Sequence, residues 1–172
     1  MSRPRDSQRS KLYKADDVLH EFASMVTTVG EVENLVAKIW SIKRLQELYP
    51  RAFRSGPPRV KDGRGTRIAR GGESYINIPL WARKTDIIIH EACHTISMRE
   101  YDRIAYHGWE FCAVYLEVTL SILGEDAYSA LLKSFRKHGV KFKKPVKRVL
   151  TEEQRAALVA RAAVARAARK KD

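Results

Sequence analysis

The chain has 172 residues and a mass of 19.7 kDa, which is room for one ordinary domain and a tail. A hydrophobic share of 44% with 9% aromatic residues can form a sizeable core, which excludes wholesale disorder. No apolar run reaches the ~18 residues of a membrane-spanning helix, and the charged start of the chain does not resemble a secretory signal, so we expect a cytoplasmic protein without a membrane partner.

The net charge of +13 is concentrated at the C-terminal end of the chain. Residues 131–172 carry fourteen Lys and Arg against three Asp and Glu, whereas the rest of the chain carries nineteen against seventeen. Such an asymmetry is typical of an arm that contacts DNA or another polyanion. The competing interpretation is a solvated, partly helical tail that contributes only solubility.

Two helices are predicted for the N-terminal third of the chain. Residues 1–10 are polar and are expected to be loosely ordered, and apolar residues at helical spacing then predict a helix over 13–22. A longer apolar stripe predicts a second helix over 31–49, which Pro50 should end.

A small antiparallel sheet is predicted to follow these helices. Three short strand-like segments, separated by Gly-containing turns, cover residues 59–61, 67–69 and 74–78. The last of them, Tyr75–Ile78, is a candidate edge with which an extended peptide substrate could pair.

Three further helices are predicted in the second half of the chain. Thr85 or Asp86 is suited to cap the first of them, and Gly139 should end the last. Their approximate ranges are 86–98, 109–123 and 127–137.

The chain is expected to divide near residue 140. Residues 1–140 hold all the predicted packed elements, whereas residues 141–172 form a basic linker and an Ala/Arg-rich helix. A capping-box pattern at Thr151–Gln154 marks the start of that last helix, and its alanines favour helix by propensity.

The segment His90-Glu91-Ala92-Cys93-His94 is an HExxH motif. Residues four apart share one face of a helix, so both imidazoles can reach one metal ion. Zinc suits neutral imidazole nitrogen and keeps an open coordination position, so Zn²⁺ is the expected cofactor. Glu91 is the expected catalytic base, because a carboxylate at that place can take a proton from a metal-bound water that attacks a carbonyl. A pair of structural histidines on a core helix is the alternative.

A catalytic zinc site also needs a third protein ligand, and His107 is the best candidate. It lies in the loop before the next predicted helix, where Gly108 allows tight backbone geometry. The competing candidates for this position are Glu110, Glu117 and Asp102.

Stabilisation of an oxyanion is the role that the sequence leaves most open. Tyr101, Tyr106 and Tyr115 flank the motif, and a tyrosine hydroxyl can donate a hydrogen bond to developing negative charge. Arg99 and Arg103 are alternatives, and ordinary packing competes with this role for each tyrosine.

The remaining histidines and the two cysteines are expected to lie outside the chemistry. His20 is predicted to be a helix-surface or core residue, and His138 to sit at a helix C-terminus. Cys93 and Cys112 lack metal-site spacing and are expected to be reduced and buried.

Several segments together resemble a known family. The strand Tyr75–Pro79, the HExxH motif and the His107-Gly108-x-x-Phe111 element are similar to those of the SprT-like zinc metallopeptidases, which include the Spartan proteases. With the N-terminal string Arg5–Tyr13, they more closely resemble a family of metallohydrolases from actinobacteria and their phages. The resemblance covers residues 5–125.

The resemblance implies a zincin-like α+β fold, in which an HExxH active-site helix packs with a small sheet and several helices. It implies that His90, His94 and His107 are zinc ligands and that Glu91 is the general base. The chain departs from the SprT-like proteases after the catalytic part, because a basic, Ala-rich tail stands where they have a cysteine-rich zinc ribbon.

The favoured hypothesis is therefore a zinc-dependent hydrolase, specifically a metallopeptidase acting on a protein or peptide substrate. The alternative is a nucleic-acid-associated protein with a basic C-terminal arm and a structural or vestigial metal site. A third hypothesis is a regulatory metallopeptidase that cuts one dedicated partner.

Overall fold

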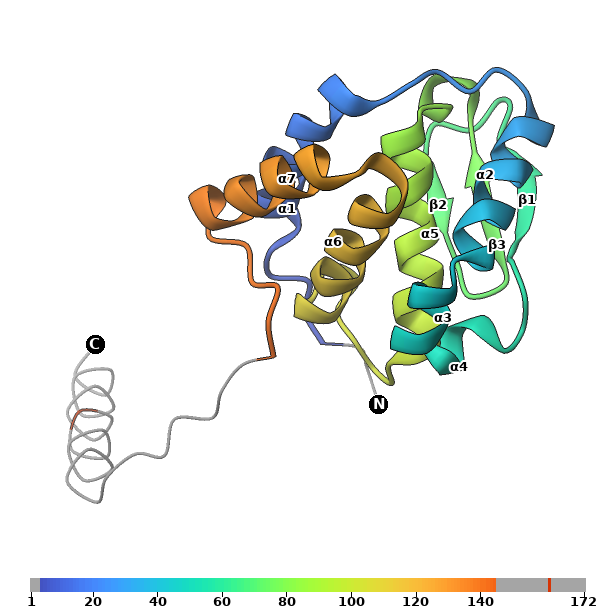
Figure 1. Ribbon diagram of the computed structural model, residues 1–172. Coiled ribbons are helices and arrows are strands. Elements are labelled where there is room, and N and C mark those ends of the chain that lie inside the picture. Colours follow the sequence, from blue (N-terminus) through green and yellow to red (C-terminus); the bar gives the residue numbers. More distant parts are fainter. Residues whose placement is uncertain (1–3, 145–160, 162–172) are drawn as a thin grey trace, which may run out of the picture.

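The computed structural model describes residues 4–144 and residue 161, and its architecture is α+β (Figure 1). The α-helices are α1 (Arg9–Asp16), α2 (Val29–Ser41), α3 (Lys43–Leu48), α4 (Pro50–Phe53), α5 (Thr85–Glu100), α6 (Trp109–Leu123) and α7 (Glu125–His138). Two 3-10 helices, η1 (Asp17–Phe22) and η2 (Leu80–Ala82), accompany three strands, β1 (Arg59–Asp62), β2 (Arg70–Gly71) and β3 (Tyr75–Ile78). Within the described part, no helix combines the length and apolar character needed to cross a membrane. The predicted C-terminal helix lies, apart from residue 161, outside the described residues.

Helix α5 runs through the middle of the fold (Figure 1). It packs against α6 on one side and against α2, α4, β2 and β3 on the others. Residues 88–97 of α5 are consequently all buried, including its polar side chains. Because buried polar groups need partners, the polar residues of α5 must find them within the protein or in a bound group.

The sheet is mixed, so the predicted antiparallel arrangement is wrong. Its order is β1-β3-β2, with β3 parallel to β1 and antiparallel to β2. The loop 63–69 crosses the end of β3, where the Gly63 N–H donates to the Ile78 carbonyl at 3.1 Å and the Asn77 side chain donates to the Thr66 hydroxyl at 3.1 Å. This loop separates β1 from β2 by the width of β3.

Strand β3 is paired along both edges, so the predicted role of Tyr75–Ile78 as a free edge for a peptide is also wrong. The edge strand beside α5 is β2, which occupies residues 70–71 instead of the predicted 67–69.

The helix predicted over 31–49 is interrupted. Thr28 and Glu31 form a capping box that starts α2 earlier, and Ile42 takes an extended conformation with ψ of 109° that separates α2 from α3. Pro50 begins α4 instead of ending a helix, since proline lacks the N–H that a first helical residue leaves unpaired anyway.

The ends of the later helices agree better with the sequence. Helix α6 has the predicted bounds, and Gly139 adopts the left-handed conformation, with φ of 63°, that ends α7. The start of α5 differs, because Lys84 is its N-cap and no side chain caps it. The Thr85 hydroxyl instead accepts a hydrogen bond from the Ser24 N–H at 3.0 Å.

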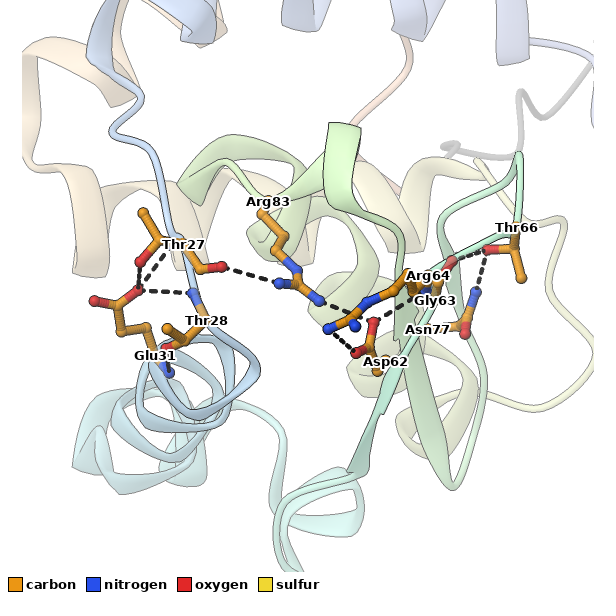
Figure 2. Close-up of polar contacts among 9 residues, drawn as sticks. All are labelled: Thr27, Thr28, Glu31, Asp62, Gly63, Arg64, Thr66, Asn77 and Arg83. Carbon is orange, nitrogen blue, oxygen red and sulfur yellow. Dashed lines mark hydrogen bonds and ion pairs between the residues drawn. The ribbon is translucent and has the colours of Figure 1, made fainter.

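A buried arginine ties the sheet to the segment before α2 (Figure 2). The guanidinium of Arg83, which is 4% exposed, donates to the Thr27 carbonyl and to Asp62 Oδ1, both at 2.9 Å. Asp62 also accepts from the backbone N–H of Arg64 at 3.0 Å. Hydrogen bonds between charged groups are stronger than neutral ones, so this cluster holds the end of β1 against the approach to α5.

The N-terminal helix completes the molecule on the other side of α5. Helix α1 packs beside α7 (Figure 1), and Leu12 of α1 and Phe135 of α7 are both completely buried. Residues 4–8 are not loosely placed, because the buried side chain of Gln8 bonds to residues of two later segments. The N-terminal segment is thereby fixed next to the start of α6.

Candidate metal centre

His90, His94 and His107 converge on one point. One nitrogen of each lies within 4.8 Å of the corresponding nitrogens of the other two, and all three side chains are buried. His90 and His94 stand one turn apart on α5, and His107 reaches them from the loop before α6. The structure therefore brings together the three residues that the sequence nominated as ligands.

The three residues fit a metal ion. His94 Nδ1 and His107 Nε2 are buried and accept or donate no hydrogen bond within the described part of the chain. An unpartnered buried polar atom is costly, whereas three converging imidazoles are a donor set that divalent transition metals favour. Imidazole nitrogen suits zinc, copper, iron and nickel, so the donor set by itself does not identify the metal.

Two carboxylates orient two of the three imidazoles. His107 Nδ1 lies 2.6 Å from Asp6 Oδ2, and His90 Nδ1 lies 3.1 Å from Asp16 Oδ2. In both rings this contact engages Nδ1 and leaves Nε2 as the nitrogen available to a metal, which is how outer carboxylates fix the tautomer and direction of a ligating histidine.

Sequence reasoning missed both carboxylates. They come from the segment 6–16, far from the histidines along the chain, and no spacing rule connects them. The one available signal was the string Arg5–Tyr13, which contains Asp6. This string supported the family resemblance, but the sequence assigned it no structural role.

Gln8 fastens this N-terminal segment to the site. Its Nε2 donates to the His107 carbonyl at 2.7 Å and to the Lys141 carbonyl at 3.0 Å, and its Oε1 accepts from the Lys141 N–H at 2.9 Å. Both the NH₂ group and the carbonyl oxygen of the Gln8 amide are therefore hydrogen-bonded. The loop that carries His107 is held between the two ends of the described chain.

Glu91 is buried next to the histidines and faces the edge strand. Its Oε2 accepts a hydrogen bond from the Gly71 N–H of β2. A Cβ atom on Gly71 would lie only 2.0 Å from the Glu91 carbonyl oxygen, so only glycine lets β2 approach α5 this closely. Burial raises the pKa of Glu91 above its ordinary value, against the opposing effects of His90 and the Gly71 N–H. A carboxyl with this environment is suited to accept a proton near neutral pH.

The three imidazoles differ in their affinity for protons. Burial, with the charge of His90 and His107, lowers the pKa of His94 well below its ordinary value. Burial and the charge of His90 also lower the pKa of His107, against the effect of Asp6. Burial opposes charge on His90 as well, but the hydrogen bond that His90 donates to Asp16 and the charge of Glu91 outweigh it and raise the pKa of His90. Neutral imidazoles bind metals, so His94 and His107 are already in the ligating form at neutral pH.

A cavity of about 380 Å³ opens beside His90 and Glu91. Its wall includes His20, which the sequence placed outside the site. His20 Nδ1 lies 2.5 Å from Asp86 Oδ2, so a contact from η1 to the first turn of α5 brings it there. His138 lies in the last turn of α7, as predicted.

None of the competing third ligands joins the histidine cluster. Glu117 bonds to Arg44 at 2.8 Å, and Asp102 bonds to Arg51 at 3.2 Å. Glu110 is not among the groups that converge, and the three histidines are the one such cluster found among residues 4–144.

The tyrosines occupy different places around the site. Tyr115 is buried against His90, with ring centres 5.4 Å apart, and Tyr101 packs on Trp109. The ring of Tyr106 lies 6.1 Å from that of His94. Arg99 donates to backbone carbonyl groups of residues 52, 56 and 73, which is a structural role.

Sequence reasoning also missed a fourth tyrosine. The ring of Tyr13, on α1, lies 5.8 Å from that of His90 and 5.3 Å from that of His107, and it lines the cavity. It is 42% exposed, and the Arg9 guanidinium lies 5.4 Å from its ring centre. Desolvation by partial burial raises the pKa of Tyr13, so its hydroxyl stays protonated and can donate a hydrogen bond.

Both cysteines are buried free thiols, in agreement with the sequence. Comparison of the chain with protein-family models, with curated proteins and with solved structures finds no match. The resemblance to SprT-like metallopeptidases therefore remains a prediction from the motifs.

Proposed function

We propose that this protein is a zinc-dependent hydrolase of zincin-like fold, specifically a metallopeptidase related to the SprT-like group. The observation that carries the proposal is the convergence of three buried histidines beside a buried glutamate at the wall of an open cavity. The HExxH and His-Gly-x-x-Phe elements give independent support from the sequence.

Each residue has a defined part in this proposal. A bound zinc ion supplies Lewis-acid activation of water and of a scissile carbonyl. His90, His94 and His107 would hold it, with Asp16 and Asp6 keeping two of the rings in orientation.

Glu91 is the residue that accepts and delivers protons in this proposal. Its Oε2 is engaged by the Gly71 N–H, so Oε1 is assigned to take the proton of the attacking water and later to deliver it to the leaving amine. Tyr13 is positioned at the mouth of the site to donate a hydrogen bond to an oxyanion.

The test combines metal analysis with one conservative substitution. Purified protein should contain about one zinc per chain by mass spectrometry, and His107→Ala should lose most of it. Glu91→Gln should keep the zinc and lose hydrolysis of a denatured protein such as casein, because an amide cannot accept the proton. Glu110→Gln, outside the cluster, is the matched control. Full activity of Glu91→Gln would overturn the mechanism, and no metal after zinc loading would overturn the hydrolase.

We also propose that the basic end of the chain contacts a polyanion such as DNA. Lys133, Lys137 and Lys141 are exposed on α7 and just beyond it, and Lys143 and Lys144 continue the run. The predicted division at residue 140 remains a prediction, but Val140 is buried and Lys141 bonds to Gln8.

A truncation that spares these contacts should therefore end after residue 144. Binding of a DNA duplex by the full chain should fall steeply with salt concentration, and the chain 1–144 should show a shallower salt slope. Equal slopes would exclude the segment beyond residue 144 as the contact.

A further inference from the structure

We infer that the cavity beside Glu91 is a side-chain pocket that selects lysine or arginine next to the bond to be cut. This inference rests on the proposed hydrolase function and adds the class of substrate. It follows from the shape, the apolar walls and the charge of one cavity.

The cavity adjoins the reacting groups. Its wall contains both His90 and Glu91, so a substrate carbonyl at the metal centre would place an adjacent side chain inside it. A volume of about 380 Å³ lies within the ~300–1,000 Å³ of small-ligand sites, which is room for a long side chain and its backbone.

The rim of the cavity exposes large apolar side chains. Ile68 is 71% exposed and Trp81 is 56% exposed, and both line the cavity together with Ile87 from α5. Such surfaces favour contact with an apolar stem. The aliphatic parts of lysine and arginine provide that stem.

The polar part of the wall is mainly acidic. Asp16, Asp17, Asp86 and Glu91 all line the cavity, against the single guanidinium of Arg67 at its exposed rim. Like charge therefore disfavours an acidic side chain in this space, and a wholly apolar one would remove the carboxylates from water without giving them a donor.

One of these carboxylates has an unused acceptor. Asp86 is 3% exposed, its Oδ2 contacts His20, and its Oδ1 is buried without a hydrogen-bond partner in the described chain. A carboxylate oxygen accepts hydrogen bonds only, so the complementary group is an N–H or O–H donor, and among these a cationic N–H group adds charge attraction.

Asp17 is the acidic group of the cavity with the weakest contacts to other side chains. Asp16 holds His90 and Asp86 contacts His20 at 2.5 Å, whereas the side chain of Asp17 is 73% exposed and its nearest recorded partner, His20, lies 3.9 Å away. Asp17→Asn should therefore remove negative charge from the cavity while leaving the metal ligands and the fold intact.

The experiment uses hydroxamates, which chelate zinc without being cleaved. Two series of probes carry the side chain of lysine, norleucine or glycine. In one series the probe is the Nα-acetyl amino-acid hydroxamate, and in the other it is the amide of the amino acid with malonyl hydroxamate. The side chain therefore lies on one side of the chelating group in the first series and on the other side in the second. Lysine and norleucine differ only by the ammonium group. Binding to the zinc-loaded full chain is measured by calorimetry, with acetohydroxamate as the probe of the metal alone.

In the better orientation, the lysine probe should bind about fivefold more tightly than the norleucine probe, and norleucine about tenfold more tightly than glycine. Asp17→Asn should reduce the lysine preference, while Glu21→Gln, an exposed charge on the same 3-10 helix that does not line the cavity, should leave it unchanged. Ala69→Phe, which fills the cavity, should weaken both long probes without affecting acetohydroxamate.

The outcomes separate the two proposals. Norleucine binding as tightly as lysine would overturn the selection of a cation, and glycine binding as tightly as norleucine would overturn the pocket. If no probe binds, acetohydroxamate included, the result would instead contradict the proposed metal centre, and this inference with it.

Discussion

Single residues far from the HExxH motif decide the geometry of the site. Asp6 and Asp16 orient two of the histidines, and glycine at position 71 lets β2 approach the backbone of Glu91. The motif supplies two of the converging imidazoles, whereas these three residues set how the rings and Glu91 are held.

Asp6 provides the clearest residue-scale prediction. Asp6→Asn keeps the shape of the side chain but removes the charge that fixes the His107 ring, so zinc affinity should fall by about tenfold or more. Competition with a chelator of known affinity measures the change. Asp17→Asn, also acidic and near the site but not bonded to a ligand, should change zinc affinity by less than about threefold. Unchanged affinity in Asp6→Asn would show that Asp6 does not position His107.

Gly71 supports a second residue-scale prediction. In Gly71→Ala the new methyl group would meet Glu91 O at 2.0 Å and His94 Cβ at 2.8 Å, so either β2 or α5 must shift. We expect a loss of about 2–3 kcal/mol in the free energy of unfolding, measured in urea. Gly30→Ala, in α2 with no atom closer than 4.0 Å, should instead gain about 0.5–1 kcal/mol. Equal effects of the two substitutions would contradict the close approach of β2.

At the scale of elements, periodicity predicted the later helices well but not the bounds of the first ones: the predicted helix 13–22 is α1 (Arg9–Asp16) followed by the 3-10 helix η1 (Asp17–Phe22), and the sheet was predicted poorly. Helix α6 and the end of α7 follow from apolar spacing and a terminal glycine, which are local properties. The order β1-β3-β2 depends on the loop 63–69 crossing the end of β3, and these contacts between distant residues leave no local pattern. The break at Ile42 was missed because the apolar stripe continues across it.

Arg83 carries the element-scale prediction, because it joins three segments. Arg83→Met removes two charge-assisted hydrogen bonds and leaves the Thr27 carbonyl and Asp62 short of a donor, so unfolding should become easier by about 2–3 kcal/mol. Arg64→Met removes an exposed contact to the same aspartate and should cost less than about 0.5 kcal/mol. Urea denaturation of both variants makes the comparison, and equal losses would show that burial of Arg83 adds nothing.

At the scale of the whole molecule, the site is assembled from both ends of the fold. The convergence of the three histidines was predictable because HExxH spacing is a property of one helix, and His107 was the nearest histidine beyond it. The outer carboxylates and Tyr13 were not, because the N-terminal segment reaches the site through tertiary contacts, the packing of α1 on α7 and the hydrogen bonds of Gln8. The metal centre and the docking of the N-terminal segment are therefore expected to stabilise each other.

Burial of the histidine cluster makes the stability of the metal-free protein depend on pH. His94 has a pKa well below its ordinary value in the folded state, chiefly through burial, but a pKa of about 6.5 when unfolded. Below pH ~6.5 the unfolded chain therefore takes up a proton that folded His94 refuses, and stability falls by up to ~1.4 kcal/mol per pH unit for this group. His107 acts in the same direction, whereas His90, whose pKa is raised, stabilises the folded state at low pH and loses that effect as pH rises.

The substitution His94→Gln isolates the contribution of His94 to the pH dependence of stability. Urea denaturation of metal-free wild type and variant from pH 5 to 8.5 should give a less steep fall in stability for the variant below pH ~6.5. Between pH 7.5 and 8.5 His94 is neutral in both states, so the two curves should run parallel there, which serves as the internal control. Parallel curves over the whole range would mean that folded His94 titrates as it does in water, which would contradict its burial in the histidine cluster.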